Sequence, residues 1–207
     1  KEYLMLKQII NKLFYNRYKF IKKHSNIKVS DTAILLKSCT FRFDVKVKNN
    51  KVSIGDNSMV GCSFVFESDE GEINVGNNSY IGGGTTLISR NNISIGNNVT
   101  IAWGCTLYDH NSHSLDYIER QKDIERQNND YRNGRNFISS KDWSVVKSKP
   151  IIIEDNVWIG FDSVILAGVT VGEGSIIGAR SVVRHNVEPW TVVAGNPAVV
   201  IKRLRDE

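Results

Sequence analysis

The sequence predicts an all-β chain that folds as a parallel β-solenoid, a stack of coils made of short strands and tight corners. Between residues 151 and 183 an aliphatic residue recurs at every sixth position, and a small or β-branched residue follows each one four positions later. A period of six fits neither an α-helix nor a half-buried strand, and it indicates one inward side chain on each flat side of a coil. The aliphatic positions are Ile153, Ile159, Ile165, Val171, Ile177 and Val183, and the small positions are Val157, Ser163, Val169, Ser175, Ser181 and Val187.

A corner motif recurs in the same register. Its four copies read I-G-D-N-S, V-G-N-N-S, I-G-N-N-V and I-E-D-N-V, and they begin at residues 54, 75, 95 and 153. Asn and Asp accept left-handed backbone angles and hydrogen-bond to their own turns, so they suit a sharp corner. The first three copies lie 21 and 20 residues apart, which fits a three-sided coil of roughly 18 residues with small corner insertions. Because one coil cannot bury its own interior, successive coils must stack about 4.8 Å apart.

Two segments precede the repeat. Residues 1–25 are basic and are predicted to form an amphipathic α-helix, which leaves residues 26–207 as the solenoid domain. We expect this helix to cap the open end of the solenoid or to pack on a neighbouring subunit; the alternative is a peripheral contact with an anionic membrane surface. Residues 27–52 contain an apolar and charged alternation around Phe41 and Phe43, which predicts a half-buried strand in a first, imperfect coil. The apolar stripe of the helix comprises Leu6, Ile10, Leu13, Phe14 and either Phe20 or Ile21.

The repeat stops after Tyr108 and resumes at Ile151, so residues 108–150 are predicted to form a long inserted loop. It opens with the sequence YDHNSHSLD, which holds two of the chain's four histidines. Loops of this length in a compact repeat are usually functional. Histidine accepts a proton near neutral pH, and a neighbouring Asp fixes its tautomer and stabilises the imidazolium. The alternative is a solvated polar loop with incidental histidines.

Composition excludes several other functions. The chain has 207 residues and a formal net charge of +5, but the basic excess lies largely in the first 25 residues and no base-reading module follows, which argues against nucleic acid as a partner. No apolar run is long enough to span a membrane. Three cysteines without metal-ligand spacing predict reduced thiols in a cytoplasmic protein, and Cys105 fills a small-residue position of the repeat. A zinc site needs three placed ligands, and His24 and His185 are distant in sequence, so no metal is predicted.

The repeat, the histidine-bearing insertion, the tetrapeptide V-W-I-G at 157–160 and the closing A-G-N-P-A-V-V-I-K at 194–202 resemble the hexapeptide-repeat acyltransferases over about residues 50–205. The chain is most similar to the maltose/galactoside O-acetyltransferase branch. Its polar insertion and basic N-terminal segment look like those of members that O-acetylate capsular or lipopolysaccharide sugars. The resemblance implies a left-handed parallel β-helix, a homotrimer with active sites between subunits, and acetyl-CoA as co-substrate. It also implies a cytoplasmic enzyme of surface-polysaccharide synthesis, with the alternative of a place at the inner face of the cell membrane.

The resemblance also implies roles for individual residues. The family motif H-P-x-D, whose histidine is the catalytic base, matches residues 113–116 with Ser in place of Pro, and His110 is a second candidate for the base. The family tryptophan that packs over the thioester arm of the donor matches Trp158, which precedes an inward residue and so is expected to point outward. Val199 stands where the family carries a basic residue near the donor's phosphates, so Arg203 or Arg205 is expected to compensate. The expected catalytic residues are His113, His110, Asp109 and Asp116, the donor-binding residues Trp158, Gly160, Ala179, Arg184, His185, Lys202 and Arg203, and the acceptor-side residues Tyr108 and Asn91.

The expected reaction is a direct transfer. His113 removes the proton of a sugar hydroxyl, whose oxygen attacks the acetyl thioester, and no covalent acyl-enzyme is needed. Two alternatives remain open. One is an acetyltransferase for another small acceptor, such as an antibiotic, a serine hydroxyl or a nucleotide-sugar amine. The other is a β-solenoid that transfers no acyl group and serves as a metal hydratase or a scaffold.

Overall fold

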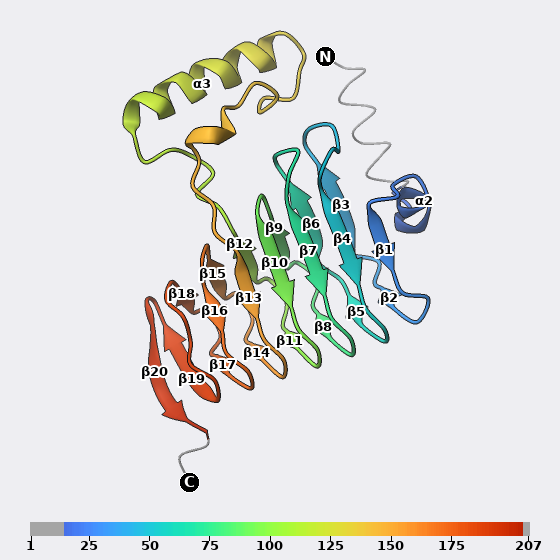
Figure 1. Ribbon diagram of the computed structural model, residues 1–207, viewed down its shortest axis with the longest axis vertical. Helices are drawn as coiled ribbons and strands as arrows, with labels where there is room; N and C mark the ends of the chain where they lie inside the picture. The colour runs from blue at the N-terminus through green and yellow to red at the C-terminus, as the bar shows by residue number, and fades with distance from the viewer. Residues whose placement is uncertain (1–14, 205–207) are drawn as a thin grey trace.

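The computed structural model describes residues 15–204, which form a stack of coils with helical segments beside it (Figure 1). Three sheets, here named A, B and C, each take parallel strands from successive coils, and sheet B ends in an antiparallel strand. Sheet A contains β1 (Ile27–Val29), β4 (Lys51–Ile54), β7 (Glu72–Val75), β10 (Asn92–Ile95), β13 (Ile151–Ile153) and β16 (Thr170–Val171). Sheet B contains β2 (Ile34–Leu35), β5 (Met59–Val60), β8 (Tyr80–Ile81), β11 (Thr100–Ile101), β14 (Trp158–Ile159), β17 (Ile176–Ile177), β19 (Thr191–Gly195) and β20 (Ala198–Arg203). Sheet C contains β3 (Thr40–Phe43), β6 (Ser63–Phe66), β9 (Thr86–Ile88), β12 (Thr106–Tyr108), β15 (Val164–Leu166) and β18 (Val182–Val183).

The register between coils confirms the predicted six-residue period. Ile95 pairs with Ile153, Ile101 with Ile159, and each inward aliphatic side chain therefore stacks on the one a coil away. These side chains are almost completely buried and form one continuous core with members from all three sheets. At about 25 cal/mol per Å² of buried apolar surface, this column of aliphatic side chains is the main stabilising term of the fold.

The small residues four positions after the aliphatic ones are also buried. Ser79 illustrates why a hydroxyl fits there: its Oγ donates to the Gly96 carbonyl at 3.0 Å and accepts from the Val99 N–H at 3.0 Å. Cys105 occupies an equivalent position and directs its thiol to the Gly160 carbonyl at 3.2 Å. Burial raises the pKa of the Cys105 thiol, so it packs in the core, as predicted, and is unsuited to act as a nucleophile.

The corner motifs form a ladder of side chains between sheets A and B. The Asp56 N–H donates to Asn77 Oδ1 at 2.7 Å, the Asn77 N–H to Asn97 Oδ1 at 2.9 Å, and the Asn97 N–H to Asp155 Oδ1 at 2.8 Å. The residue that follows each of these has the predicted left-handed backbone, with φ of 55°, 54°, 57° and 63° at Asn57, Asn78, Asn98 and Asn156. The corner thus satisfies backbone donors and turns the chain at the same time.

The first coil is made of β1, β2 and β3, as predicted, but the strand around Phe41 ends at Phe43 and residues 44–50 form a loop. Phe41 and Phe43 stack on Phe64 and Phe66 of the next coil with ring centroids 4.9 and 5.1 Å apart. Most of the predicted helix 1–25 lies outside the described residues. Within them the helix is α2 (Arg17–Ile21), whose last two residues pack against the core.

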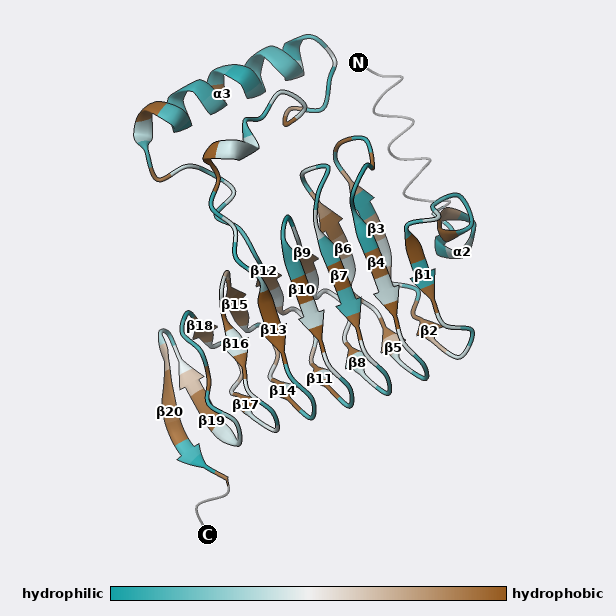
Figure 2. Cartoon of the chain, in the orientation of Figure 1, coloured by the Kyte–Doolittle hydropathy of each residue, from teal (hydrophilic) through white to brown (hydrophobic). Residues whose placement is uncertain are grey.

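The insertion between β12 and β13 is helical in part, so the prediction of a long loop over residues 108–150 is wrong in its local structure, and the chain is mostly β rather than all-β. It contains α3 (Tyr117–Arg132) and a single 3₁₀ turn, η1 (Trp143–Val145). Figure 2 shows α3 as largely hydrophilic, in contrast to the strands. Within residues 15–204, no helix combines the length and the apolarity needed to cross a bilayer.

The position of the insertion follows from the order of the sheets. It leaves sheet C after β12 and returns to sheet A at β13, so it rises from the edge where these two sheets meet. Sheet B lies on the opposite side of the coil, as Figure 1 shows for β14 and β17. Anything on the outward face of sheet B is therefore separated from the insertion of the same chain by the core.

The corner prediction is tested at Asn98, whose side chain is not needed for the ladder. Asn98→Ala should lower the free energy of unfolding by about 1 kcal/mol, because a Cβ without a local polar group disfavours the left-handed backbone. Asn98→Gly, the matched control, should stay within roughly 0.5 kcal/mol of the parent chain. Urea denaturation followed by circular dichroism measures both, and equal losses in the two variants would contradict this account of the corner.

Candidate active site

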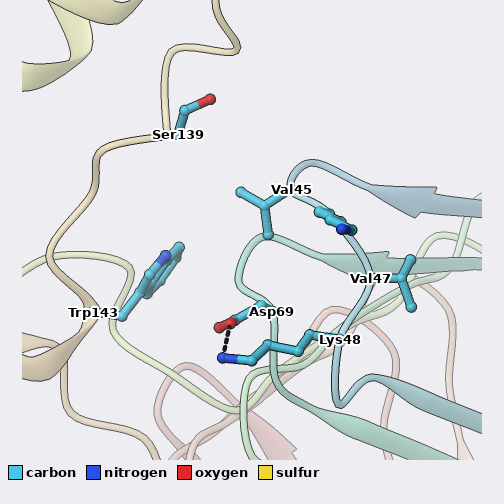
Figure 3. A pocket seen from close by; sticks show the side chains of 7 residues that line it. Val45, Val47, Lys48, Asp69, Ser139 and Trp143 are labelled. Carbon is cyan, nitrogen blue, oxygen red and sulfur yellow. Dashed lines mark ion pairs between the residues drawn. The ribbon is translucent and has the colours of Figure 1, made fainter.

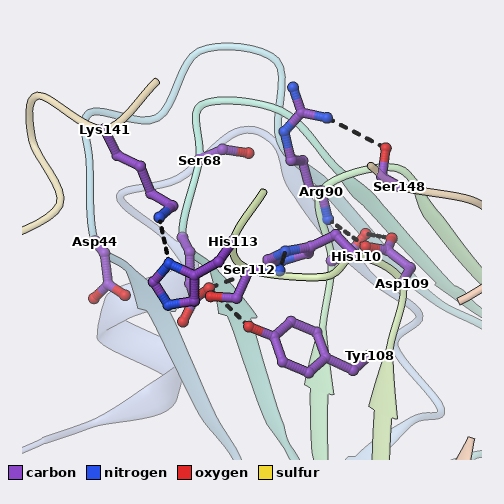
Figure 4. A network of polar contacts seen from close by, with 12 residues as sticks. Asp44, Ser68, Arg90, Tyr108, Asp109, His110, Ser112, His113, Lys141 and Ser148 are labelled. Carbon is purple, nitrogen blue, oxygen red and sulfur yellow. Dashed lines mark hydrogen bonds and ion pairs between the residues drawn. The ribbon is translucent and has the colours of Figure 1, made fainter. Parts of the chain in front are cut away.

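His113 lies at the start of the insertion and contacts a carboxylate from α3. Its Nδ1 lies 2.8 Å from Asp123 Oδ2, and its side chain is 46% exposed whereas that of Asp123 is only 9% exposed. A carboxylate accepts hydrogen bonds, so Nδ1 carries the hydrogen and Nε2 keeps its lone pair. The Lys141 ammonium forms an ion pair with the same Asp123 oxygen and lies 3.4 Å from His113 Nδ1. The imidazole is thus held at Nδ1, where Figure 4 shows its contact with Lys141.

The local sequence explains how α3 places the Asp123 carboxylate beside His113. Asp116 is the N-cap of α3, and its side chain accepts from the Ile118 N–H at 2.9 Å. The interpretation of Asp116 as the carboxylate beside the catalytic histidine is therefore not supported, because the cap holds its oxygens at the helix start. Asp123, two turns later, faces the protein together with Asp130, which is fully buried against Arg135 and Ser140. The inward face of α3 is thus held by charges rather than by an apolar stripe.

His110, the second candidate base, is buried in a different environment. Its Nδ1 accepts from the Ser112 N–H at 3.1 Å, and its ring meets the rings of Tyr108 and Trp143 edge-on. Burial lowers the pKa of His110 to about 4, with further lowering from the charges of Arg90 and Lys141. Its Nε2 is buried without a hydrogen-bond partner, 3.8 Å from Glu67 Oε2. The ring is therefore neutral at physiological pH and shielded from solvent.

Asp109 does not contact either imidazole through its carboxylate. Its oxygens accept from Ser89 Oγ at 2.7 Å and from the backbone N–H groups of Arg90 and Asn91 at 2.8 and 2.9 Å. Burial raises the pKa of Asp109, although these donors oppose the shift. Its place in the fold is to tie the loop between β9 and β10 to the end of β12. This loop brings Arg90 within 5.7 Å of the Trp143 ring centre.

The acceptor-side residues predicted from the sequence lie around His110. The Tyr108 hydroxyl donates to Glu67 Oε2 at 3.1 Å, and burial raises the pKa of Tyr108 to about 12. The Asn91 side chain reaches Ser148 Oγ at 3.4 Å. Tyr108 and Asn91 are therefore near the start of the insertion, as expected, but both are engaged by protein groups.

Five of the seven predicted donor-binding residues lie on or beside sheet B, on the other side of the molecule. Trp158 is 52% exposed on the outward face of sheet B, which confirms the predicted orientation. A Cβ at Gly160 would meet the backbone of Ala179, so the two coils approach closely beside the tryptophan. Lys202 and Arg203 lie on β20, at the exposed end of the same sheet, and Lys202 pairs with Val192. Arg205 lies outside the described residues. Arg184 and His185 are exposed but follow β18 of sheet C, so they lie at a different corner.

The structure thus divides the predicted site into two halves. His113, His110, Asp109, Tyr108 and Asn91 gather at the edge of sheets A and C, whereas Trp158, Gly160, Ala179, Lys202 and Arg203 lie on or beside sheet B. Within one chain the core separates these halves.

Sequence analysis missed three residues of the histidine cluster: Asp123, Lys141 and Glu67. A signal for α3 is present, because Asp116 and Glu119 stand three apart and no Gly or Pro occurs between residues 117 and 132. Recognising that helix places Asp123 ten residues after His113, two turns inside it. Lys141 and Glu67 have no comparable signal, since their contacts depend on how the insertion folds back.

A cavity of about 540 Å³ lies beside this cluster, between the insertion and the loop after β3 (Figure 3). Trp143 and Ser139 line it from the insertion, and residues 45–48 with Asp69 line it from the body. The Lys48 ammonium pairs with Asp69 at 3.4 Å. Lys141 lies between the cavity and His113, because its Nζ is 5.3 Å from the Trp143 ring centre and 3.4 Å from His113 Nδ1.

Comparison with known proteins agrees with the repeat. Residues 150–185 match the family model described as bacterial transferase hexapeptide (six repeats). The chain is 45% identical over 56 residues to a chloramphenicol acetyltransferase of Agrobacterium fabrum (strain C58), an alignment that covers 27% of each chain. Matches to the curated relatives span under a third of their length.

Solved structures cover far more of the chain. AntD, an N-acyltransferase from Bacillus cereus in complex with dTDP and 3-hydroxybutyryl-CoA, has a TM-score of 0.65 at 18% identity, with 93% of this chain and 90% of that one covered. A hexapeptide-repeat-containing acetyltransferase of Vibrio cholerae complexed with acetyl coenzyme A has a TM-score of 0.55 at 25% identity, over 92% of this chain and 77% of that one. Residues 150–185 therefore carry the bacterial transferase hexapeptide repeat, on a chain whose fold is that of the hexapeptide-repeat acyltransferases.

Proposed function

We propose that this chain is an acetyl-CoA-dependent O-acetyltransferase that transfers an acetyl group to a sugar hydroxyl in surface-polysaccharide biosynthesis. The observation that carries the proposal is the His113–Asp123 pair at the break in a repeat that the chain shares with acetyltransferases. A half-exposed imidazole, oriented by a buried carboxylate, has the geometry of a general base. The relatives named as acetyltransferases supply the class of donor.

The mechanism follows from the atoms of this pair. His113 Nε2 takes the proton of the acceptor hydroxyl while the oxygen attacks the thioester carbonyl. The tetrahedral intermediate then expels the thiolate of coenzyme A, which receives the proton back from the imidazolium. Asp123 is a positioning residue, because its contact with Nδ1 fixes the tautomer and stabilises the imidazolium. Proton transfer of this kind contributes typically about 10²–10⁴-fold to the rate.

The donor is proposed to lie along the outward face of sheet B. Trp158 offers an exposed ring for the thioester arm, and the close coils at Gly160 and Ala179 offer a narrow path beside it. Lys202 and Arg203 on β20 supply positive charge for the phosphates of coenzyme A. Arg184 and His185 lie at the edge between sheets C and A instead, away from this face. Arg180, 5.9 Å from the Phe161 ring centre, is a further cation next to Ala179.

The two halves meet only if two copies of the chain are adjacent. Because the core separates the insertion from sheet B within one chain, His113 of one copy must stand beside Trp158 of another. A closed ring of identical copies repeats that contact at every interface. This geometry supports the homotrimer with sites between subunits that the resemblance implies, and the left-handed coil stays a prediction with it.

His110 is proposed to have a positioning role. Its buried, neutral ring packs between Tyr108 and Trp143 and so holds the start of the insertion against the body. His110 remains the second candidate for the base, because catalytic hydrogen bonds are often formed only once the substrate is bound.

A different acceptor is the second candidate function. AntD is an N-acyltransferase that binds dTDP, which favours an amine on a nucleotide-linked sugar, although the likeness of this chain to AntD concerns the fold. The donor chemistry and His113 have the same roles for both acceptors. An acceptor screen that detects coenzyme A release with a thiol reagent distinguishes a hydroxyl acceptor from an amine acceptor.

The base assignment predicts a large loss in one variant. His113→Ala should reduce sugar-dependent coenzyme A release by about 10²–10⁴-fold, because proton removal is lost. Asp123→Asn should lower kcat while the KM for acetyl-CoA stays unchanged. Circular dichroism checks that each variant is folded. Full activity in His113→Ala, combined with an inactive and folded His110→Ala, would transfer the role of base to His110.

The shared site predicts complementation between two impaired variants. His113→Ala and Trp158→Ala should be impaired in different halves of the site, so mixed oligomers refolded from equal amounts should recover activity. A random mixture places an intact His113 beside an intact Trp158 at about one interface in four, so the rate should rise toward a quarter of the wild-type value. Refolded samples of each variant alone serve as controls. A mixture that stays at the mean of these two controls would show that both residues act within one chain.

A further inference from the structure

The cavity beside Trp143 shares one lining residue, Lys48, with a second cavity. The second one, of about 780 Å³, lies over the outward face of the first strands of sheet A. Each falls within the roughly 300–1,000 Å³ that small-molecule sites occupy. We call the two cavities together the groove; its lining runs from the insertion to β1, β4 and β7.

The two ends of this groove differ in chemistry. At the insertion end, Trp143 offers an aromatic surface, with Ser139 and the Lys48–Asp69 pair as hydrogen-bonding groups beside it. An aromatic ring flanked by a hydroxyl and a carboxylate suits a pyranose, which has apolar C–H faces and a rim of hydroxyls. This is also the end nearest to His113, through Lys141.

The middle and far end are positively charged and rich in amides and hydroxyls. Lys46 lines the first cavity and Lys28 and Lys51 the second, and among residues 15–204 no carboxylate lies within ion-pair distance of any of these three ammonium groups. Lys48, which lines both cavities, is only partly compensated, because its pair with Asp69 is exposed. Lysine ammonium groups that lack carboxylate partners attract phosphate. The far cavity also contains one carboxylate, that of Glu72, the register partner of Lys51, but it is not within ion-pair distance of these lysines. The remaining polar lining residues are Asn26, Asn49, Asn50, Asn74, Ser25 and Ser53.

We propose that this groove, defined by Trp143, Lys46, Lys48, Lys28 and Lys51, is the acceptor site and that its ligand is a sugar joined through a diphosphate to a carrier. The sugar lies against Trp143, the diphosphate lies over Lys46 and Lys48, and the carrier extends across the face of sheet A. The order of sugar, diphosphate and carrier along the groove rests on the proposed function, because the acetylated sugar must be the part nearest His113. The lysines bind the diphosphate, and a diphosphate is present in both nucleotide-linked and lipid-linked sugars.

Equilibrium binding without acetyl-CoA tests the groove separately from catalysis. Isothermal titration calorimetry uses three probes, namely dTDP-glucose, UDP-glucose and glucose linked through a diphosphate to a citronellyl chain. At least one should bind, and Lys46→Glu and Lys48→Glu should each weaken it by about tenfold or more, with affinity falling as salt is added. Lys37→Glu, an exposed lysine between β2 and β3, is the matched control and should bind as the parent chain does. The preferred probe identifies the carrier as nucleoside or lipid.

A substitution of Trp143 tests the end of the groove that is proposed to hold the sugar. Trp143→Ala should reduce the affinity for the preferred sugar diphosphate to that of the same carrier diphosphate without sugar, while leaving the latter unchanged. The proposal would be overturned if none of the three probes bound, or if binding were equal in Lys46→Glu, Lys48→Glu and Lys37→Glu. Equally tight binding of neutral methyl glucoside would also overturn it. An inactive enzyme that still shows lysine-dependent binding would contradict the acyl transfer and leave the groove in place.

Discussion

The structure depends on one constraint, which is that each coil must place its inward aliphatic side chains directly over those of the coil before it. Parallel strands two to four residues long have few backbone hydrogen bonds of their own, so the stack holds only when every coil keeps the same register. Ile95, Ile153 and Val171 stack in one column, and Ile101, Ile159 and Ile177 in another. A shift of one residue in any coil would turn a buried column toward solvent.

That constraint determines where new chemistry enters the fold. Residues 109–150 leave after β12 and return at β13, yet both strands keep their register with the neighbouring coils. An insertion at a corner is therefore compatible with the stack, whereas one within a strand would break a column. Asp109, buried under the loop between β9 and β10, secures the point of departure. Within the insertion, Asp123 and Asp130 hold α3 through Lys141 and Arg135, so polar contacts rather than apolar burial determine how the helix packs on its flanking segments.

Sequence alone predicted the parts that repeat. A pattern repeated in every coil is visible without knowing the fold. The six-residue register therefore predicts the left-handed backbone at Asn98, the burial of Cys105 and the outward side chain of Trp158. The insertion occurs once, and its contacts join residues far apart in the chain, such as Lys141 with Asp123. Asp116 is an example: its spacing from His113 matches a family motif, but its Oδ1 caps a helix that the periodicity could not reveal, and the carboxylate in contact with His113 is that of Asp123.

The two-sided distribution of the predicted site residues leads to the central claim, that a base from one copy acts on a donor held by another. A crystal structure with coenzyme A bound tests this most directly. The account predicts that the coenzyme lies along sheet B of one copy, with its sulfur between that copy's Trp158 and Nε2 of His113 from the adjacent copy. Coenzyme A bound elsewhere, with the His110 and His113 rings of every copy remote from its sulfur, would contradict the account.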